Sequence, residues 1–332
     1  MAKILIKHIA EKLDVSNTTV SLVLSGKATN GRVSKSMIEK INAFAKELDY
    51  EPNNMARGLR VGKSKIIGLI VADISNIFFS KLAFYIQEHA EKFGYTVMIT
   101  NTNESDEKMQ KVINVLKGQQ VDGFIIVPTE NGEPHIRELI DKDIPVVLLD
   151  RYFPNLDTSH VVVDNYNASK KAVKHLIDSG CKKIALFIYK NNLIHIQERK
   201  RGYIEVLQEA GLYDKKLIKE VRYQTLESDM DKAVDCLFEN DPHVDGVFFA
   251  TNSLSLGGIR RIMDKKIKIQ DDIKVVCFDK NDAFDFTNVK ISHVLQPIPE
   301  MGNMAVSILI ELIERNKNTP FKTALSSSLF LY

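Results

Sequence analysis

The chain has 332 residues, enough for a small module and a large domain, and its 45 Lys and Arg nearly balance 43 Asp and Glu. No stretch approaches the roughly 20 apolar residues that a membrane-spanning helix needs. Lys3, Lys7 and His8 interrupt any apolar secretory signal at the N-terminus. The three cysteines fit neither a disulfide framework nor a zinc site, which favours reduced core thiols. We therefore expect a cytoplasmic protein without a membrane segment.

The charge is distributed unevenly along the chain. Residues 1–65 contain 12 Lys and Arg and 6 Asp and Glu, a net charge of +6, whereas the remainder has a net charge of −4. A basic head on a slightly acidic body indicates that nucleic-acid binding is confined to the head.

Two short helices joined by a tight turn are predicted near the N-terminus. Apolar residues recur at helical spacing over 9–13 and again over 20–24, and Ser16 is placed to cap the second helix. The outer side of the second helix carries short, mostly polar, uncharged residues: Asn17, Thr18, Ser21 and Leu22. Such groups suit phosphates and base edges in the DNA major groove. The spacing alone would equally fit an ordinary helical hairpin.

A third helix is predicted from a cap at Ser34 to about Leu48, because its apolar residues form one stripe. The first sixty residues also carry four spaced motifs: Val15-Ser16-x-x-Thr19-Val20-Ser21, Arg32-Val33-Ser34, Leu48-x-Tyr50-x-Pro52-Asn53 and Ala56-x-x-Leu59. On these motifs the segment resembles the DNA-binding headpiece of the lactose/purine repressor family of bacterial transcription regulators.

The resemblance implies a helix-turn-helix DNA-binding head over residues 1–50, followed by a hinge helix and linker over 51–64. The second helix of the head would lie in a major groove, and Leu59 of the hinge would wedge between base steps of the minor groove. The residues expected to contact DNA are Ser16, Asn17, Thr18, Thr19, Ser21, Leu22, Tyr50, Asn53, Ala56 and Leu59. The expected assembly is a homodimer on a pseudo-palindromic operator.

Apolar runs of strand length alternate with amphipathic segments from residue 65 onward. The expected strands are 66–71, 97–100, 123–127, 146–150, 161–163, 184–188, 246–250, 274–278 and a short last one at 329–332. The expected helices are 82–93, 108–118, 136–141, 168–179, 197–210, 228–238, 254–265 and 299–315. Strands buried on both faces and separated by helices indicate parallel sheets in an α/β architecture.

The pattern restarts at Asn165, which favours two doubly wound lobes over a single sheet. The family resemblance extends over residues 65–332 and implies an effector-binding and dimerisation domain with the fold of periplasmic sugar-binding proteins. In that fold the chain crosses between the lobes three times. We place the N-lobe at about 65–164 and 294–324, and the C-lobe at about 165–293 and 325–332. Both sheets would bind ligand at the carboxyl ends of their strands, so the expected site is the cleft between the lobes.

Polar and aromatic side chains follow the strands at these ends. The candidate effector-binding residues are Asn76, Phe78, Phe79, Asp150, Arg151, Asn165, Arg199, Asn252, Asp279 and Gln296. The resemblance implies effector contacts for Asp150, its neighbour Arg151, and the arginine of the Arg-x-x-Gly-Tyr motif at Arg199. Two positions depart from the family, since Ile77 replaces a proline and Ser253 replaces an aspartate. Each candidate alone could be a cap or turn residue, but together they favour a ligand site.

The sequence therefore predicts an effector-responsive transcription regulator, with repression favoured and activation left open. Carboxylates and amides suit sugar hydroxyls, whereas a purine would need an aromatic sandwich, which Phe78, Phe79 and Tyr166 could form in part. A solute-binding receptor would share the lobed body but not the basic head. An enzyme is the third alternative. It ranks last because the chain has no phosphate-loop, GxSxG or HExxH signature. No cofactor and no metal are expected.

Overall fold

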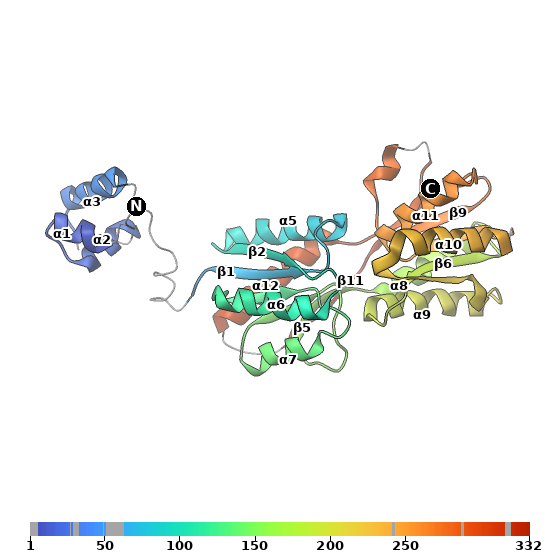
Figure 1. Ribbon diagram of the computed structural model, residues 1–332, viewed down its shortest axis with the longest axis horizontal. Helices are drawn as coiled ribbons and strands as arrows, with labels where there is room; N and C mark the ends of the chain where they lie inside the picture. The colour runs from blue at the N-terminus through green and yellow to red at the C-terminus, as the bar shows by residue number, and fades with distance from the viewer. Residues whose placement is uncertain are drawn as a thin grey trace. The chain divides into compact units, whose positions relative to one another are not determined.

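The computed structural model describes residues 6–26, 28, 33–48, 50, 63–240, 243–286, 289–315 and 320–332. The chain separates into two compact units, Met1–Ser64 and Lys65–Tyr332. Figure 1 labels the helices of both units and several of the strands.

Three helices form the described part of the N-terminal unit: α1 (Ile6–Lys12), α2 (Asn17–Leu24) and α3 (Lys35–Glu47). The Thr19 amide donates to the Ser16 hydroxyl at the start of α2, over 3.1 Å, and this confirms the predicted cap. Ser34 caps α3 in the same way. The apolar stripes predicted for the three helices pack into one small core around Ile9, Val20 and Ile41, which are fully buried.

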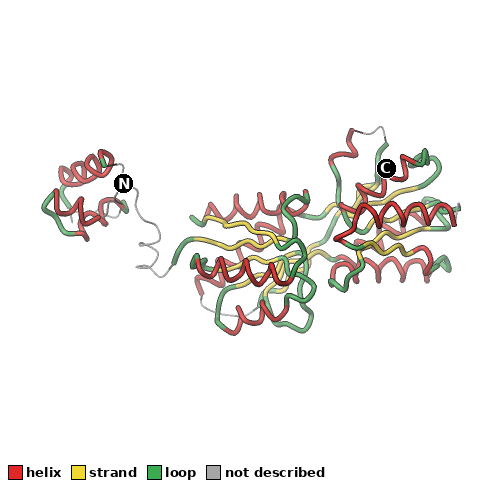
Figure 2. The backbone as a smooth tube through the Cα atoms, in the orientation of Figure 1, coloured by secondary structure: helices red, strands yellow, loops and turns green. Residues whose placement is uncertain are grey.

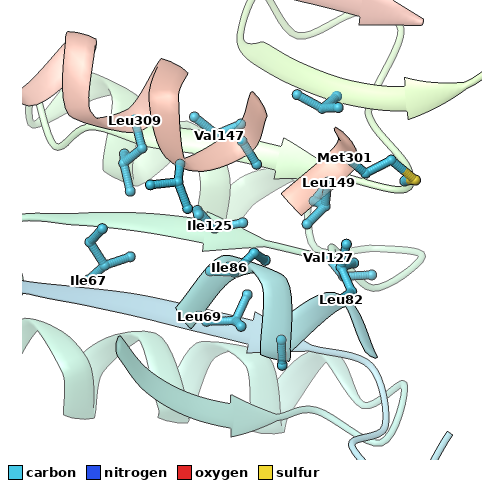
Figure 3. Close-up of a cluster of buried hydrophobic side chains, with 14 of the residues drawn as sticks. Ile67, Leu69, Leu82, Ile86, Ile125, Val127, Val147, Leu149, Met301 and Leu309 are labelled. Atoms are coloured by element: carbon cyan, nitrogen blue, oxygen red, sulfur yellow. The ribbon is translucent and has the colours of Figure 1, made fainter. Parts of the chain in front are cut away.

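The N-lobe is built on a six-stranded parallel sheet with the order β11-β5-β4-β3-β1-β2. Its strands are β1 (Ile66–Val71), β2 (Thr96–Asn101), β3 (Gly123–Ile126), β4 (Val146–Leu149), β5 (Ser159–Val163) and β11 (Lys322–Leu325). Its helices are α5 (Ile77–Lys92), α6 (Asp106–Gly118), α7 (Glu133–Asp141) and α12 (Ile298–Arg315). Side chains of α5 and α12, such as Leu82 and Leu309, pack on one face of the sheet in a buried core (Figure 3). The α6 and α7 side chains form a second core on the other face.

The C-lobe repeats this arrangement with the order β12-β10-β9-β8-β6-β7, in which only β12 is antiparallel to its neighbour. Its strands are β6 (Ile184–Tyr189), β7 (Ile218–Val221), β8 (Gly246–Phe249), β9 (Lys274–Phe278), β10 (Ser292–Leu295) and β12 (Ser328–Phe330). Its helices are α8 (Asn165–Asp178), α9 (Ile194–Glu209), α10 (Leu226–Asn240) and α11 (Asn252–Asp264). In both lobes helices cover the two faces of the sheet (Figure 2).

The chain crosses between the lobes after β5, after β10 and after β11. The second crossing follows Leu295, because His293 and Val294, where the sequence placed it, still belong to β10. The two sheets have the same relative strand order, so β4 of the N-lobe corresponds to β9 of the C-lobe, and β5 corresponds to β10. This correspondence brings the carboxyl ends of both sets of strands to the interlobe cleft.

Several helices begin earlier than the sequence predicts, because polar residues at the strand ends act as caps. Asn76 accepts a hydrogen bond from the Phe78 amide, so α5 begins at Ile77 rather than at residue 82. Asp164 likewise caps α8. Strands β7, β10 and β11 were not predicted. The sequences of β7 (Ile-Lys-Glu-Val) and β11 (Lys-Thr-Ala-Leu) have little apolar character, and neither strand is central in its sheet. The segment of β10 was interpreted as a crossing between the lobes. The interpretation of all three cysteines as core thiols is wrong for Cys236, which is exposed on α10.

Candidate functional site

A cavity of about 140 Å³ lies between the two lobes, at the carboxyl ends of their strands. Its walls come from the segments that follow β1, β2, β3 and β4 in the N-lobe and β6, β7, β8, β9 and β10 in the C-lobe. Nine of the ten predicted effector residues line it: Asn76, Phe78, Phe79, Asp150, Arg151, Arg199, Asn252, Asp279 and Gln296. Residues more than 200 positions apart thus meet in one place, as the parallel-sheet rule anticipates.

Asp150 and Asp279 occupy corresponding positions, directly after β4 and β9. Both have left-handed backbone conformations, with φ of +68° and +73°. Their amides donate to the neighbouring strands, from Asp150 to the Val161 carbonyl over 3.0 Å and from Asp279 to the Val294 carbonyl over 2.9 Å. Aspartate tolerates this conformation better than most residues, and such strained positions concentrate at binding sites. Each lobe thus contributes one buried carboxylate to the cavity.

Burial controls the protonation of these carboxylates. It raises the pKa of Asp279 to about 6, although the Arg199 charge and a hydrogen bond from Gln296 oppose the shift. Burial also raises the pKa of Asp150, against the attraction of Arg151 and Arg199. The Gln296 Nε2 atom donates to Asp279 Oδ1 over 2.7 Å, whereas Gln296 Oε1 is buried without a partner among the described residues. A bound ligand could supply that missing partner.

Arg199 is the basic group at the centre of the C-lobe wall and is 2% exposed. Its Nε donates to Asn165 Oδ1 over 2.8 Å and its Nη1 to the Ala250 carbonyl over 2.7 Å. The guanidinium stacks on Phe278, with 3.4 Å from Cζ to the ring centroid. Burial lowers the pKa of Arg199 to about 10, so it stays charged at neutral pH. Nη2 makes no hydrogen bond within the described part of the chain, which leaves a donor for a ligand.

Arg151 is already paired within the N-lobe. Its Nη1 and Nη2 donate to both carboxylate oxygens of Glu104, over 2.8 and 2.9 Å, and Nη1 also donates to the Pro128 carbonyl. Sequence analysis missed Glu104, because the turn that positions it depends on positive φ angles at Asn103 and Glu104. No residue pattern in a single sequence predicts that left-handed backbone conformation.

His195 is a second residue that sequence analysis missed. It lies one turn before Arg199 on α9, lines the cavity and is 7% exposed. Burial, together with the charges of Arg151 and Arg199, lowers the pKa of His195 well below its usual value, so the imidazole is neutral. Its Nδ1 has no hydrogen-bond partner in the described structure. The four-residue spacing from Arg199, which places both on one helix face, was the available signal.

Polar contacts join the lobes around the cavity. They are Tyr223 to Asp73 (3.1 Å), Asn76 to Ser253 (3.3 Å), Asn192 to Glu130 (2.9 Å) and the ion pair of Lys81 with Asp282 (3.0 Å). The cavity is therefore narrowed by side chains that must separate before a larger molecule can enter.

Two family models match the chain. One, described as bacterial regulatory proteins of the lacI family, matches residues 5–53. The other, described as periplasmic binding proteins and the sugar binding domain of the LacI family, matches residues 64–324. The chain belongs to the lacI family of bacterial regulatory proteins.

Similar proteins agree with this assignment. The ribose operon repressor of Halalkalibacterium halodurans is 32% identical over 98% of this chain and 95% of its own length. The catabolite control protein A of Priestia megaterium is 32% identical over 95% of this chain and 93% of its own. The crystal structure of the lac repressor dimer bound to operator and the anti-inducer ONPF has a TM-score of 0.86. It covers 99% of this chain and 98% of that one at 20% identity, which shows the shared fold.

As a lacI-family protein, the chain is a DNA-binding transcription regulator, and its body has the predicted two-lobed, periplasmic-binding-protein-like fold. The matched head argues against the solute-receptor alternative, and the matched relatives are transcription regulators. Across the described residues, no helix has the length and apolarity to cross a membrane. In the same residues, no cluster of three or more His, Cys, Asp or Glu could hold a metal.

Five of the ten predicted DNA contacts lie on α2 of this lacI-family head, and a sixth, Ser16, caps that helix. Asn17 and Thr18 are exposed, and Ser21 and Leu22 are half-buried. The hydroxyls of Ser16 and Thr19 lie 2.9 Å apart, so both also take part in the cap. Tyr50 packs against the head core. Three predicted contacts lie outside the described residues: Asn53, Ala56 and Leu59.

Asn165 does not line the cavity, which corrects the prediction of a direct effector contact. Its Nδ2 donates to the Val163 carbonyl while its Oδ1 accepts from Arg199, so it positions the arginine. Tyr166 is also directed elsewhere, because its hydroxyl donates to Glu205 and its ring stacks with Arg201. An aromatic sandwich that includes Tyr166 is therefore not formed.

Proposed function

We propose that the protein is a repressor that binds operator DNA as a homodimer and that a small sugar-like effector, bound between the lobes, controls its operator affinity. The observation that carries this proposal is the convergence of Asp150, Asp279, Arg199 and Asn252 on one interlobe cavity. Carboxylates and amides accept hydrogen bonds from hydroxyls, and a guanidinium donates to them. The matching family model is described by sugar binding, and one relative is a ribose operon repressor.

A sugar fits the cavity better than a purine. A flat base needs two parallel aromatic faces, whereas the Phe78 and Phe79 rings meet edge to face, 5.0 Å apart at 72°. Phe278 lies behind Arg199 and is not part of the lining. The remaining aromatic groups in the lining, Tyr189 and Tyr223, also meet at a steep angle of 60°. A purine effector is thus the second candidate.

The proposed organisation is a DNA-binding head over residues 1–50, a hinge and linker over 51–64, and the effector-binding and dimerisation domain over 65–332. The hinge would place Leu59 in the minor groove at the operator centre. An effector that bonds both lobes would change their separation, and through the N-lobes the spacing of the two hinges, so the two sites share one coupling free energy. A regulator of this kind acts on the chromosome, which supports a cytoplasmic location. It needs neither a cofactor nor a catalytic step.

Selection of duplex DNA from a random pool by the full-length protein tests this proposal. We expect a pseudo-palindromic consensus, and an affinity for it that changes when a member of a sugar panel is added. Asp279→Ala should bind the same DNA and lose the response, because the truncation leaves ligand hydroxyls unpaired at a cost of about 1–3 kcal/mol. As a matched control, Asp157→Ala removes a 73% exposed carboxylate outside the cavity and should respond like the parent. DNA binding without sequence preference would contradict the proposal.

A further inference from the structure

The charged side chains that line the cavity determine which charge of effector the cavity favours. Five carboxylates and three cations lie in its walls: Asp73, Glu104, Glu130, Asp150 and Asp279 against Arg151, Lys190 and Arg199. His195 adds no charge, because burial keeps it neutral. The lining is therefore net negative, which opposes the entry of an anion.

Of the two buried cations, Arg151 is paired with carboxylates of the protein, whereas the hydrogen bonds of Arg199 go to the neutral oxygens of Asn165 and Ala250. The Arg151 side chain is 4% exposed, and both of its terminal nitrogens donate hydrogen bonds to Glu104. Its Nε lies 3.5 Å from Asp150 Oδ2. The charge of Arg199 is balanced by Asp279 and Asp150. A carboxylate or phosphate on a ligand would have to displace Glu104 from Arg151, and at Arg199 it would meet the opposing charges of Asp279 and Asp150.

Lys190 differs from the two arginines. It forms no ion pair with a carboxylate among the described residues, and it is exposed to solvent. A hydrated ammonium at the mouth of the cavity attracts an anion only weakly, because water screens the interaction. It therefore does not reverse the preference set by the buried groups.

Glu104 decides whether Arg151 is available. The pair is bidentate, the geometry in which an arginine binds a carboxylate or a phosphate most tightly. Glu104 thus occupies the place at Arg151 that an anionic group of a ligand would take. Removing the charge of Glu104 would leave the buried guanidinium with only the longer 3.5 Å contact to Asp150, so that a ligand anion could take the place of Glu104.

We propose that the Glu104–Arg151 pair sets the charge class of the effector, restricting the cavity to uncharged polyols such as neutral sugars and rejecting sugar acids and sugar phosphates. Glu104 is then a specificity-determining residue. This inference rests on the proposed function, since it concerns the same cavity and assumes that a sugar-like molecule binds there.

The test compares the full-length parent with Glu104→Gln by isothermal titration calorimetry. The probes are neutral aldopentoses, aldohexoses and disaccharides, together with the matching aldonic acids, uronic acids and sugar phosphates. The parent should bind a neutral sugar and reject its anionic derivatives. In Glu104→Gln, the affinity ratio of anionic to neutral probe should rise about tenfold or more, because the freed guanidinium gains a ligand partner.

Glu133→Gln is the matched control. It removes an Arg–Glu pair of the same lobe, the exposed contact of Glu133 with Arg137, which lies outside the cavity lining. Its ratio of anionic to neutral affinity should equal that of the parent. The parent measurements stand by themselves even where Glu104→Gln fails to fold.

Two results would overturn the assignment of charge class while leaving an effector-controlled regulator intact. One is a parent that binds a sugar acid or phosphate at least as tightly as the neutral sugar. The other is a folded Glu104→Gln variant whose affinity ratio equals that of the parent. If no probe of either class bound to parent or variant, the proposed sugar site would itself be contradicted, and the charge assignment with it.

Discussion

Replacing Asp279 by asparagine should stabilise the body of the protein at neutral and higher pH while weakening effector binding. The Asp279 side chain is 8% exposed, and burial raises its pKa from 3.8 to about 6. The folded state therefore binds this proton more tightly than the unfolded state does. Stability that the protonated carboxyl provides at low pH is lost as the pH rises from 3.8 through 6.

The size of the effect follows from the same values. The difference between a pKa of 3.8 and one of about 6 corresponds to roughly 3 kcal/mol at pH 8. Asparagine never ionises, and its oxygen can still accept the hydrogen bond from Gln296. The stability advantage of Asp279→Asn should therefore grow by roughly 1–2 kcal/mol between pH 5 and pH 8.

Urea unfolding of parent and variant, followed by circular dichroism in matched buffers from pH 5 to pH 8, measures this difference. Comparing the two proteins cancels the titration of His195 and the other buried histidines, which both contain. Asp157→Asn, at an exposed aspartate outside the cavity, is the matched control and should not reproduce the effect of Asp279→Asn. A difference for Asp279→Asn that stays constant, or that falls towards pH 8, would refute the reasoning. It would mean that the charged carboxylate is fully compensated by Arg199.

Three further predictions concern DNA contact and lobe opening. The affinity for operator DNA, measured by fluorescence anisotropy between 50 and 200 mM salt, should fall steeply, by orders of magnitude if about six or more phosphates are contacted, because the head carries a net charge of +6. Leu22→Arg should change the preferred base at one symmetric position of each half-site in a binding selection, since arginine can bond guanine and leucine cannot; an unchanged consensus would remove this residue from the groove. Tyr223→Phe deletes the hydrogen bond to Asp73 between the lobes. It should speed effector association several-fold in stopped-flow measurements, and equal rates would show that this contact does not limit opening.

The sequence was most informative where a local rule acts. Periodicity located all the described α-helices and nine of the twelve described strands, and the capping roles of Ser16 and Ser34 follow from residue type and position alone. Nine of the ten candidate effector residues share one cavity because parallel strands bring their carboxyl ends to one edge. Strands β7 and β11 escaped prediction because an edge strand needs little apolar character. Strand β10 escaped it because its four residues include Ser292 and His293 and form no apolar run.

The Arg-x-x-Gly-Tyr motif shows the limit of pattern matching within the site. Its arginine, Arg199, lines the cavity, but its glycine and tyrosine have packing roles. A Cβ atom on Gly202 would lie 2.6 Å from the Tyr166 carbonyl oxygen, so glycine permits the close approach of α8 and α9. The fully buried Tyr203 donates to the Ile184 carbonyl over 2.7 Å. The same approach brings Asn165 to Arg199, a contact between two helices that spacing along one chain cannot reveal.

The strength of the contacts between the lobes determines what an effector can do. The ion pair of Lys81 with Asp282 is exposed on both sides and contributes at most about 1 kcal/mol, and the hydrogen bonds across the cleft contribute about 0.5–1.5 kcal/mol each. Opening the lobes without a ligand is therefore an event of a few kcal/mol, which thermal motion can populate. An effector that bonds both Asp150 and Asp279 gains contacts in each lobe only when the lobes are close. Its binding free energy then adds directly to the closed state, and a differential affinity of a few kcal/mol suffices to shift the population that the DNA-binding heads sense.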